Sequence, residues 1–142
     1  MIPQKLNSFL KQEKTAVLSL PVDDNGTIHS AALLFSHSQE PVRFYFITGR
    51  STEKCKKLLA GESQKASVVI GMVKDVDFTL QMRGEVRIIE KSEEIINLHQ
   101  AKFPGGMDKA DDENNVLLEF KPHWGSYCNY SKGFERHMLE LN

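Results

Sequence analysis

The stretch that decides the fold is residues 42–59, which read VRFYFITGRSTEKCKKLL. Its first part, Val42 to Thr48, is aromatic and β-branched with rough alternation, a pattern typical of a strand. Gly49 interrupts this pattern, and helical spacing of the apolar residues begins at Ser51. The stretch therefore predicts a strand that turns directly into a helix.

The junction between this strand and this helix has the composition of an anion site. A helix N-terminus leaves backbone N–H groups without intrahelical partners and carries partial positive charge, so an anion is favoured there. Thr48, Ser51 and Thr52 add hydroxyl groups, and Arg50 and Lys54 add positive charge. The alternative is that Ser51 or Thr52 only caps the helix while the basic residues are solvated. This stretch alone favours the cap, and other parts of the chain must decide.

The rest of the chain predicts more strands than helices. Asn25-Gly26 is typical of a hairpin turn, and Gly84 inside a long alternating strand indicates a bulge or bend. We expect helices over residues 1–14 and 92–103, a polar loop over 36–41, and further strands over 15–20, 27–35, 66–73, 78–89, 116–120 and 124–130, the last as a strand or a structured return.

Six or seven short strands with peripheral helices do not fit the strict alternation of a parallel βαβ fold. We therefore predict a mainly β protein, an antiparallel Greek-key split barrel, as one domain over residues 1–142 with a C-terminal tail at 131–142. Side chains fill a barrel of this size, so a ligand is expected outside it or between subunits. The apolar residues of the tail, Phe134, Met138 and Leu141, are expected to dock weakly onto a partner.

Composition excludes several classes of partner. The chain has 142 residues, 18 basic and 19 acidic, and a net charge of -1, so it has no overall electrostatic footprint for nucleic acid or an anionic membrane. Cys55 and Cys128 have no metal-type spacing, and nothing at the start resembles an export signal. The longest apolar run is far shorter than the roughly 20 residues that a membrane-spanning helix requires. We expect a reduced, cytoplasmic protein.

The sequence contains no zinc-type cluster, no Walker-type glycine loop and no nucleophile elbow, so we expect no metal site and identify no catalytic residue. What remains is the 48–54 junction, the small residues from Ser30 to Leu33, Gln81, and the aromatic residues Trp124, Tyr127 and Tyr130. A phosphate at one end, a flat ring hydrogen-bonded by Gln81 and an aromatic lid would together describe a flavin mononucleotide (FMN) site.

Three motifs carry a resemblance to a known family. In order and spacing, the chain from about Leu6 to Tyr130 resembles the pyridoxamine 5′-phosphate oxidase-like FMN-binding split barrels. The motifs are Phe44-Tyr45-Phe46-Ile47-Thr48, the turn from Ser51 to Lys54, and Leu80-Gln81-Met82-Arg83-Gly84-Glu85-Val86. The resemblance implies a homodimer with two flavins at its interface. It also implies an FMN phosphate site formed by Thr48, Ser51, Thr52 and Lys54.

The same resemblance implies that Gln81 contacts the flavin ring and that Trp124 covers it as a lid. It further implies that Ser30, Ala31, Ala32 and Leu33 line the ring and the ribityl chain. The vitamin-forming oxidases themselves carry Arg and Lys on the strand here formed by Ile28 to Phe35, and they end in a substrate-binding arginine motif. This chain lacks both features, so we do not expect it to be that oxidase.

The first hypothesis is an FMN-dependent oxidoreductase that moves electrons between a reduced nicotinamide and an unidentified small-molecule acceptor. The second is a dimer that binds FMN, haem or a deazaflavin as a carrier or sensor without turnover. In that case His123 or His137 is a candidate iron ligand, although most such histidines are ordinary surface residues. The third is an empty dimeric barrel that serves protein contacts.

Overall fold

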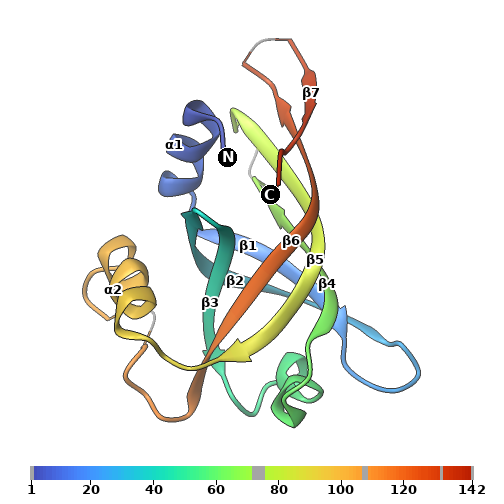
Figure 1. Ribbon diagram of the computed structural model, residues 1–142, viewed down its shortest axis with the longest axis vertical. Helices are drawn as coiled ribbons and strands as arrows, with labels where there is room; N and C mark the ends of the chain where they lie inside the picture. Colours follow the sequence, from blue (N-terminus) through green and yellow to red (C-terminus); the bar gives the residue numbers. More distant parts are fainter. Residues whose placement is uncertain (1, 72–75, 107–108, 132, 142) are drawn as a thin grey trace.

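The computed structural model describes residues 2–71, 76–106, 109–131 and 133–141. Within these residues, six antiparallel strands close into a barrel and a seventh strand extends one edge (Figure 1). The barrel order is β3-β2-β1-β4-β5-β6, with β6 pairing back to β3, and β7 pairs with β6. The elements are α1 (Gln4–Gln12), β1 (Thr15–Pro21), β2 (Ile28–Gln39), β3 (Val42–Gly49), the 3₁₀ turns η1 (Glu53–Cys55) and η2 (Leu58–Ala60), β4 (Gln64–Ile70), β5 (Phe78–Ile89), α2 (Glu93–Lys102), β6 (Asn115–Asn129) and β7 (Glu135–Met138).

The strand order confirms the Greek key. Strands β1, β2 and β3 follow one another as neighbours, and β4 returns to lie beside β1, giving the spatial order β4-β1-β2-β3. The connection that makes this return, residues 50–63, contains both 3₁₀ turns and crosses one end of the barrel (Figure 1). The predicted mainly β split barrel is therefore correct.

Alternating side chains fill the barrel. On β1, Ala16, Leu18 and Leu20 are buried while the residues between them are half-exposed, which is the period-2 pattern of a strand with one face in a core. The fully buried large side chains include Leu10, Phe35, Phe44, Phe46, Ile70, Leu80 and Phe120. A ligand therefore has to bind outside the barrel, as expected for its size.

Strand β2 is longer than predicted, and the polar loop expected over 36–41 is wrong. Residues 36–39 continue the strand and pair with β3, leaving Glu40 and Pro41 as the turn. The two buried polar side chains of this extension, Ser36 and His37, are accommodated because each has a buried partner. Ser36 Oγ lies 2.8 Å from His99 Nδ1, and the His37 Nε2–H donates to Asn7 Oδ1 at 2.6 Å.

The helix predicted after β3 is also wrong, because the segment forms two short 3₁₀ turns. Their backbone bonds span three residues, as in Cys55 N–H to Thr52 O at 3.1 Å and Gly61 N–H to Leu58 O at 3.0 Å. The segment is pinned to the tip of the β1–β2 hairpin, since Lys57 Nζ lies 2.9 Å from Asp24 Oδ1. Two compact 3₁₀ turns are therefore enough for the connection from β3 to β4 to cross the end of the barrel.

The strands predicted over 116–120 and 124–130 are one continuous strand, β6. The prediction separated them at Pro122, which normally interrupts a central strand. Here Pro122 lies opposite Gly84 at a shift in the β5–β6 register, so the bulge predicted at Gly84 is confirmed. A Cβ on Gly84 would lie 2.0 Å from Lys121 O, so only glycine permits the close approach of the two backbones.

The remaining elements mostly follow the prediction. Strand β5 has the expected bounds, and Ser92 caps α2 by accepting a hydrogen bond from Ile95 N–H at 3.2 Å. Strand β4 ends at Ile70, and residues 72–75, which include the rest of the predicted strand and its turn, lie outside the described residues. The tail forms β7 and buries Leu139, while Phe134 and Met138 remain exposed, so their docking onto a partner stays a prediction. No helix in the described ranges is long and apolar enough to cross a membrane.

Candidate functional site

The barrel is split along the first half of β2. Residues 28–34 pair with β1 on one side, but β3 pairs only with residues 35–39. The other edge of residues 28–34 therefore has no strand partner among the described residues, and η1 packs beside β2 instead. Backbone N–H and C=O groups along such an edge remain available to bind a ligand.

In the turn that follows β3, the threonine hydroxyl is hydrogen-bonded to the backbone of the turn itself. The Thr52 Oγ1–H donates to Gly49 O at 2.7 Å, and the Thr52 side chain has no cap bond to η1. The expected α-helical N-terminus is absent here, so the full helix dipole that motivated the phosphate site is absent too. Any anion at this turn must be bound chiefly by side chains and by single backbone N–H groups.

Lys54 is the strongest anion-binding candidate in this turn. It is only 7% exposed, and burial lowers the pKa of its ammonium group, although the nearby Cys55 partly opposes this. Its Nζ has no hydrogen-bond or ion-pair partner among the described residues. A largely buried cation without a counter-charge is costly, so an anion bound beside it would be stabilised.

The other predicted phosphate residues are placed differently. Thr48 is buried and shares the inward parity of Phe44 and Phe46, so its side chain belongs to the barrel end. Ser51 is exposed at the start of the turn, next to Arg50, whose N–H donates to Asn114 O at 2.7 Å. Of the four predicted residues, Ser51, Thr52 and Lys54 lie together in the turn after the strand.

Two of the four predicted ring-binding residues on β2 lie on the outer face of the barrel. Ser30 and Ala32 are exposed, and Ser30 Oγ lies 2.7 Å from Ser19 Oγ on β1. Ala31 and Leu33 are half-buried, and Leu33 packs against the core. These residues occupy the half of β2 whose edge is open. The structure therefore places the small-residue segment and the Lys54 turn at the same split.

Gln81 and Trp124 share this outer face but lie far from β2. Pairing through β1 and β4 sets Ala32 three strands from Gln81, about 14 Å along the sheet. Trp124 lies four strands from Ser30, about 19 Å along the sheet. Within one chain these side chains do not surround one flavin ring.

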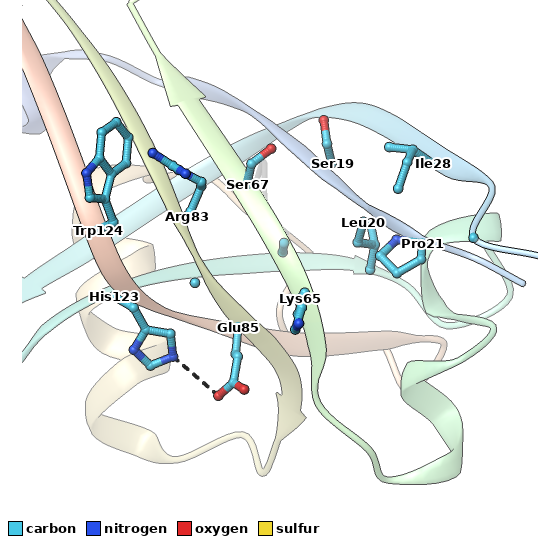
Figure 2. A pocket seen from close by; sticks show the side chains of 13 residues that line it. Ser19, Leu20, Pro21, Ile28, Lys65, Ser67, Arg83, Glu85, His123 and Trp124 are labelled. Carbon is cyan, nitrogen blue, oxygen red and sulfur yellow. Dashed lines mark ion pairs between the residues drawn. The ribbon is translucent and has the colours of Figure 1, made fainter. Parts of the chain in front are cut away.

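The structure also contains a groove that sequence reasoning missed. It has a volume of about 780 Å³ and lies between the β1–β2 hairpin and the β5–β6 bulge. Figure 2 shows Trp124, Arg83, Ser67 and Ser19 following one another across four strands at its edge, with His123 and Glu85 below them. The glycine that predicts the bulge was the available signal, but the sequence did not show which strand would lie opposite.

Two side-chain pairs stand beside this bulge. The Arg83 guanidinium lies 3.8 Å from the centroid of the Trp124 ring, and His123 Nε2 lies 3.4 Å from Glu85 Oε2. The other candidate iron ligand, His137 on β7, stacks on Tyr127 of β6, away from the groove. Among the residues that the structure places, no group of three or more His, Cys, Asp or Glu side chains could bind a metal ion.

These features define a class of protein: a small antiparallel split barrel whose interior is filled and whose candidate ligand-binding groups lie on the outer face and at the open edge of β2. The family follows from the sequence. The model described as "Pyridoxamine 5'-phosphate oxidase" matches residues 2–129, and the chain belongs to this family. No curated protein matches the sequence significantly.

Solved structures share the fold at low sequence identity. General Stress Protein 26 from Bacillus anthracis is 23% identical with a TM-score of 0.70, and the match covers 97% of each chain. ChuZ from Campylobacter jejuni is 14% identical with a TM-score of 0.73, covering 96% of this chain and 58% of ChuZ. HutZ from Vibrio cholerae, described as a haem storage protein, is 14% identical with a TM-score of 0.63, covering 84% of this chain and 88% of HutZ. At these identities the likeness establishes the fold alone.

Proposed function

We propose that the protein is an FMN-dependent oxidoreductase that transfers electrons between a reduced nicotinamide and a small-molecule acceptor. The observation that carries this proposal is the buried Lys54 ammonium group, which has no partner in the described parts of the chain, in a turn beside the open edge of β2. A phosphate there would supply the missing counter-charge. Membership of the pyridoxamine 5′-phosphate oxidase family supports the same cofactor class.

Each group at the split has a role in this proposal. Lys54, Ser51 and Thr52 bind the phosphate, and the exposed backbone from Ser30 to Leu33 donates and accepts hydrogen bonds along the flavin. Thr48 supports the turn from inside the barrel end. When bound, FMN supplies the hydride-accepting ring, so the protein needs to provide only binding, orientation and electrostatic tuning.

A homodimer completes this site. Gln81 and Trp124 face outward but lie too far from the β2 split to contact the same ring within one chain. If the outer faces of two copies pack together, Gln81 and Trp124 of each copy can reach the flavin held by the other. This arrangement uses every predicted ring-binding residue, which a single chain does not.

The visible absorption spectrum of the purified protein tests the cofactor. We expect a flavin spectrum, release of FMN on denaturation, and bleaching on addition of a reduced nicotinamide. Lys54→Met should weaken FMN binding at least about tenfold, because it removes a charge-assisted contact to the phosphate. Lys56→Met is the matched control, since Lys56 is exposed and ion-paired with Glu53 at 2.8 Å. A colourless protein that takes up no FMN would refute the proposal and favour the empty barrel.

One observation favours a second candidate, a haem-binding or sensor protein. His123 Nε2 lies 3.4 Å from Glu85 Oε2 at the rim of an open groove, and iron-ligating histidines are often oriented by a carboxylate. HutZ, which shares the fold, is described as a haem storage protein. A Soret band that is lost in His123→Ala would establish this candidate, whereas a deazaflavin would be identified by the chromophore released.

A further inference from the structure

Two positive charges lie side by side at the seam between β3 and β6. The β3–β6 ladder ends at the pair of Phe44 and Phe120, and Arg43 and Lys121 lie one residue beyond it, facing one another. Both point away from the core, because side chains alternate along a strand and the two phenylalanines are fully buried. Opposing residues have Cβ atoms about 5 Å apart, and like charges at that separation destabilise a sheet. An anion bound by this seam pair would remove that cost.

The carboxylates beside the seam pair are engaged with other bases. Glu85 pairs with Lys121 across the β5–β6 ladder, yet its Oε2 lies 3.4 Å from His123 Nε2 (Figure 2). Glu119 Oε1 accepts hydrogen bonds from Arg87 Nε and Nη2 at 3.3 and 3.1 Å. Among the residues that the structure places, neither base of the seam pair has an ion-pair partner.

Two pockets flank the seam pair, and their linings differ in charge. One has a volume of about 270 Å³ and contains Glu85 and Glu119, whose carboxylates would repel an anion. The other has a volume of about 210 Å³, and its lining residues besides the pair are Val42, Pro122, His123 and Leu141. This smaller pocket, which we call the seam pocket, combines three basic side chains with an apolar wall. No carboxylate is among the described residues that line it.

Arg43 is held in place at the seam pocket. It is half-buried, and its Nη1–H donates to Val42 O at 2.8 Å, which fixes the guanidinium relative to its strand. Its remaining N–H groups have no acceptor in the described parts of the chain, so they are available to a ligand. Lys121 is exposed and adds a second charge from the opposite strand. Two positive charges match a phosphate monoester, whose charge is about -2 near neutral pH.

We propose that the seam pocket is a binding site for small phosphate monoesters. The Arg43 fork and the Lys121 ammonium group bind the phosphate oxygens, and the ester group lies against the apolar wall. None of the residues assigned to the flavin lines this pocket, and the strand order puts the β1–β4 pair on the opposite side of the barrel. The site therefore does not rest on the proposed FMN-dependent function.

Isopropyl phosphate is the probe, because it carries the dianion and a small apolar group. Its binding is followed through the backbone amide shifts of a ¹⁵N-labelled sample, with calorimetry for the affinity. We expect saturating shifts at residues 42, 43, 121 and 123. Isopropyl sulfate, a monoanion of the same shape, should bind at least about fivefold more weakly. Inorganic phosphate, which lacks the apolar group, should bind at least about threefold more weakly.

Variants locate the site. Arg43→Met should weaken isopropyl phosphate binding about tenfold and Arg43→Lys by less, because lysine keeps the charge but loses the fork. Lys121→Met should weaken it about fivefold. Lys65→Met is the matched control and should bind like the parent, since Lys65 is an exposed strand lysine that lines neither pocket. The amide spectrum of each variant verifies that it is folded.

A titration of Lys54→Met separates this site from the turn after β3. The amides at the seam should shift at the same isopropyl phosphate concentrations in Lys54→Met as in the parent. The inference is overturned if these amides do not move, if Arg43→Met binds like the parent, or if inorganic phosphate binds as tightly as the ester. FMN uptake without binding at the seam would refute this inference alone, and binding at the seam without FMN uptake would refute the proposed function alone.

Discussion

His37 is a buried histidine whose protonation the fold opposes. Burial, together with the nearby positive charges of Lys102 and Lys11, lowers its pKa to about 4. The ring stacks on Phe44, with its centroid 5.8 Å away, and donates to Asn7 on α1. The neutral form is therefore the one that joins α1 to the barrel.

This burial predicts loss of stability in acid. Between pH 6.5 and 4 the unfolded chain binds a proton that the folded chain does not, so the free energy of unfolding falls as the pH falls through this window. The expected loss by pH 4 is about 3 kcal/mol. Urea unfolding of His37→Gln should lack most of this dependence, while His29→Gln, on the same strand, should retain it. Equal pH profiles for the parent and His37→Gln would contradict the assignment.

Gly84 is the residue on which the bulge depends. A Cβ at this position would lie 2.0 Å from Lys121 O and 2.8 Å from Pro122 Cα, both of which are backbone atoms. We therefore expect Gly84→Ala to lower the free energy of unfolding by about 3 kcal/mol. Gly26→Ala, which meets no neighbour but has φ of +76°, should cost only about 1 kcal/mol. Chemical denaturation measures the free energy of unfolding of both variants. A larger loss for Gly26→Ala than for Gly84→Ala would contradict the prediction.

At the scale of elements, the sequence predicted most strands but misplaced their ends. Alternation and the Asn25-Gly26 turn were sufficient for β1, β3 and β5. The errors occurred where a tertiary contact overrode local preference. His99 and Asn7 let β2 continue through polar residues, and Gly84 lets β6 continue through Pro122. Such partners are distant in sequence, so local patterns cannot reveal them.

Helix α2 is joined to α1 and β2 through Lys102. Its Nζ donates to Leu10 O at 2.9 Å and lies 3.6 Å from the centroid of the Phe35 ring. Burial lowers the pKa of this amine to about 7, although Glu13 partly opposes the shift. The amine is thus held by a carbonyl and an aromatic face, with little water.

The depressed pKa of Lys102 predicts a rise in stability with pH. Between pH 7 and its ordinary value of 10.5, the unfolded chain binds a proton that the folded chain lacks, so unfolding becomes less favourable as the pH rises. The free energy of unfolding should therefore increase from pH 7 to pH 9.5 in the parent and in Lys5→Met, which alters an exposed lysine on α1. The increase should be much smaller in Lys102→Met. A parallel increase in all three proteins would show that Lys102 titrates normally.

At the scale of the whole molecule, the sequence predicted the barrel correctly but not the distances between the candidate site residues. Ser30 to Leu33 and Lys54 were both candidates, and the fold brings β2 and η1, which carry them, into contact. Gln81 and Trp124 were assigned to the same ring, yet strand order separates them from β2. Residue type indicates which side chains suit a ligand, but only the pairing order gives the distances between them.

The separation of Gln81 and Trp124 from the split leads to the last prediction, a homodimer through the outer face of β2, β1, β4 and β5. Val17, Ala32 and Val69 lie in one row across this face, next to Gln81, and they are small or apolar although none is fully buried. Small apolar side chains without charge suit the centre of an interface. Sedimentation should therefore give twice the 16.1 kDa mass of one chain.

Val69→Arg places a charge at the centre of this face and should give a folded monomer, because the side chain points away from the core. FMN affinity should fall with the loss of the dimer if each copy completes the flavin site of the other. Leu98→Arg is the matched control, since Leu98 is an exposed leucine on α2, away from this face, and that variant should remain dimeric. A dimeric Val69→Arg would place the interface elsewhere, and a monomer with unchanged FMN affinity would show that one chain suffices for binding.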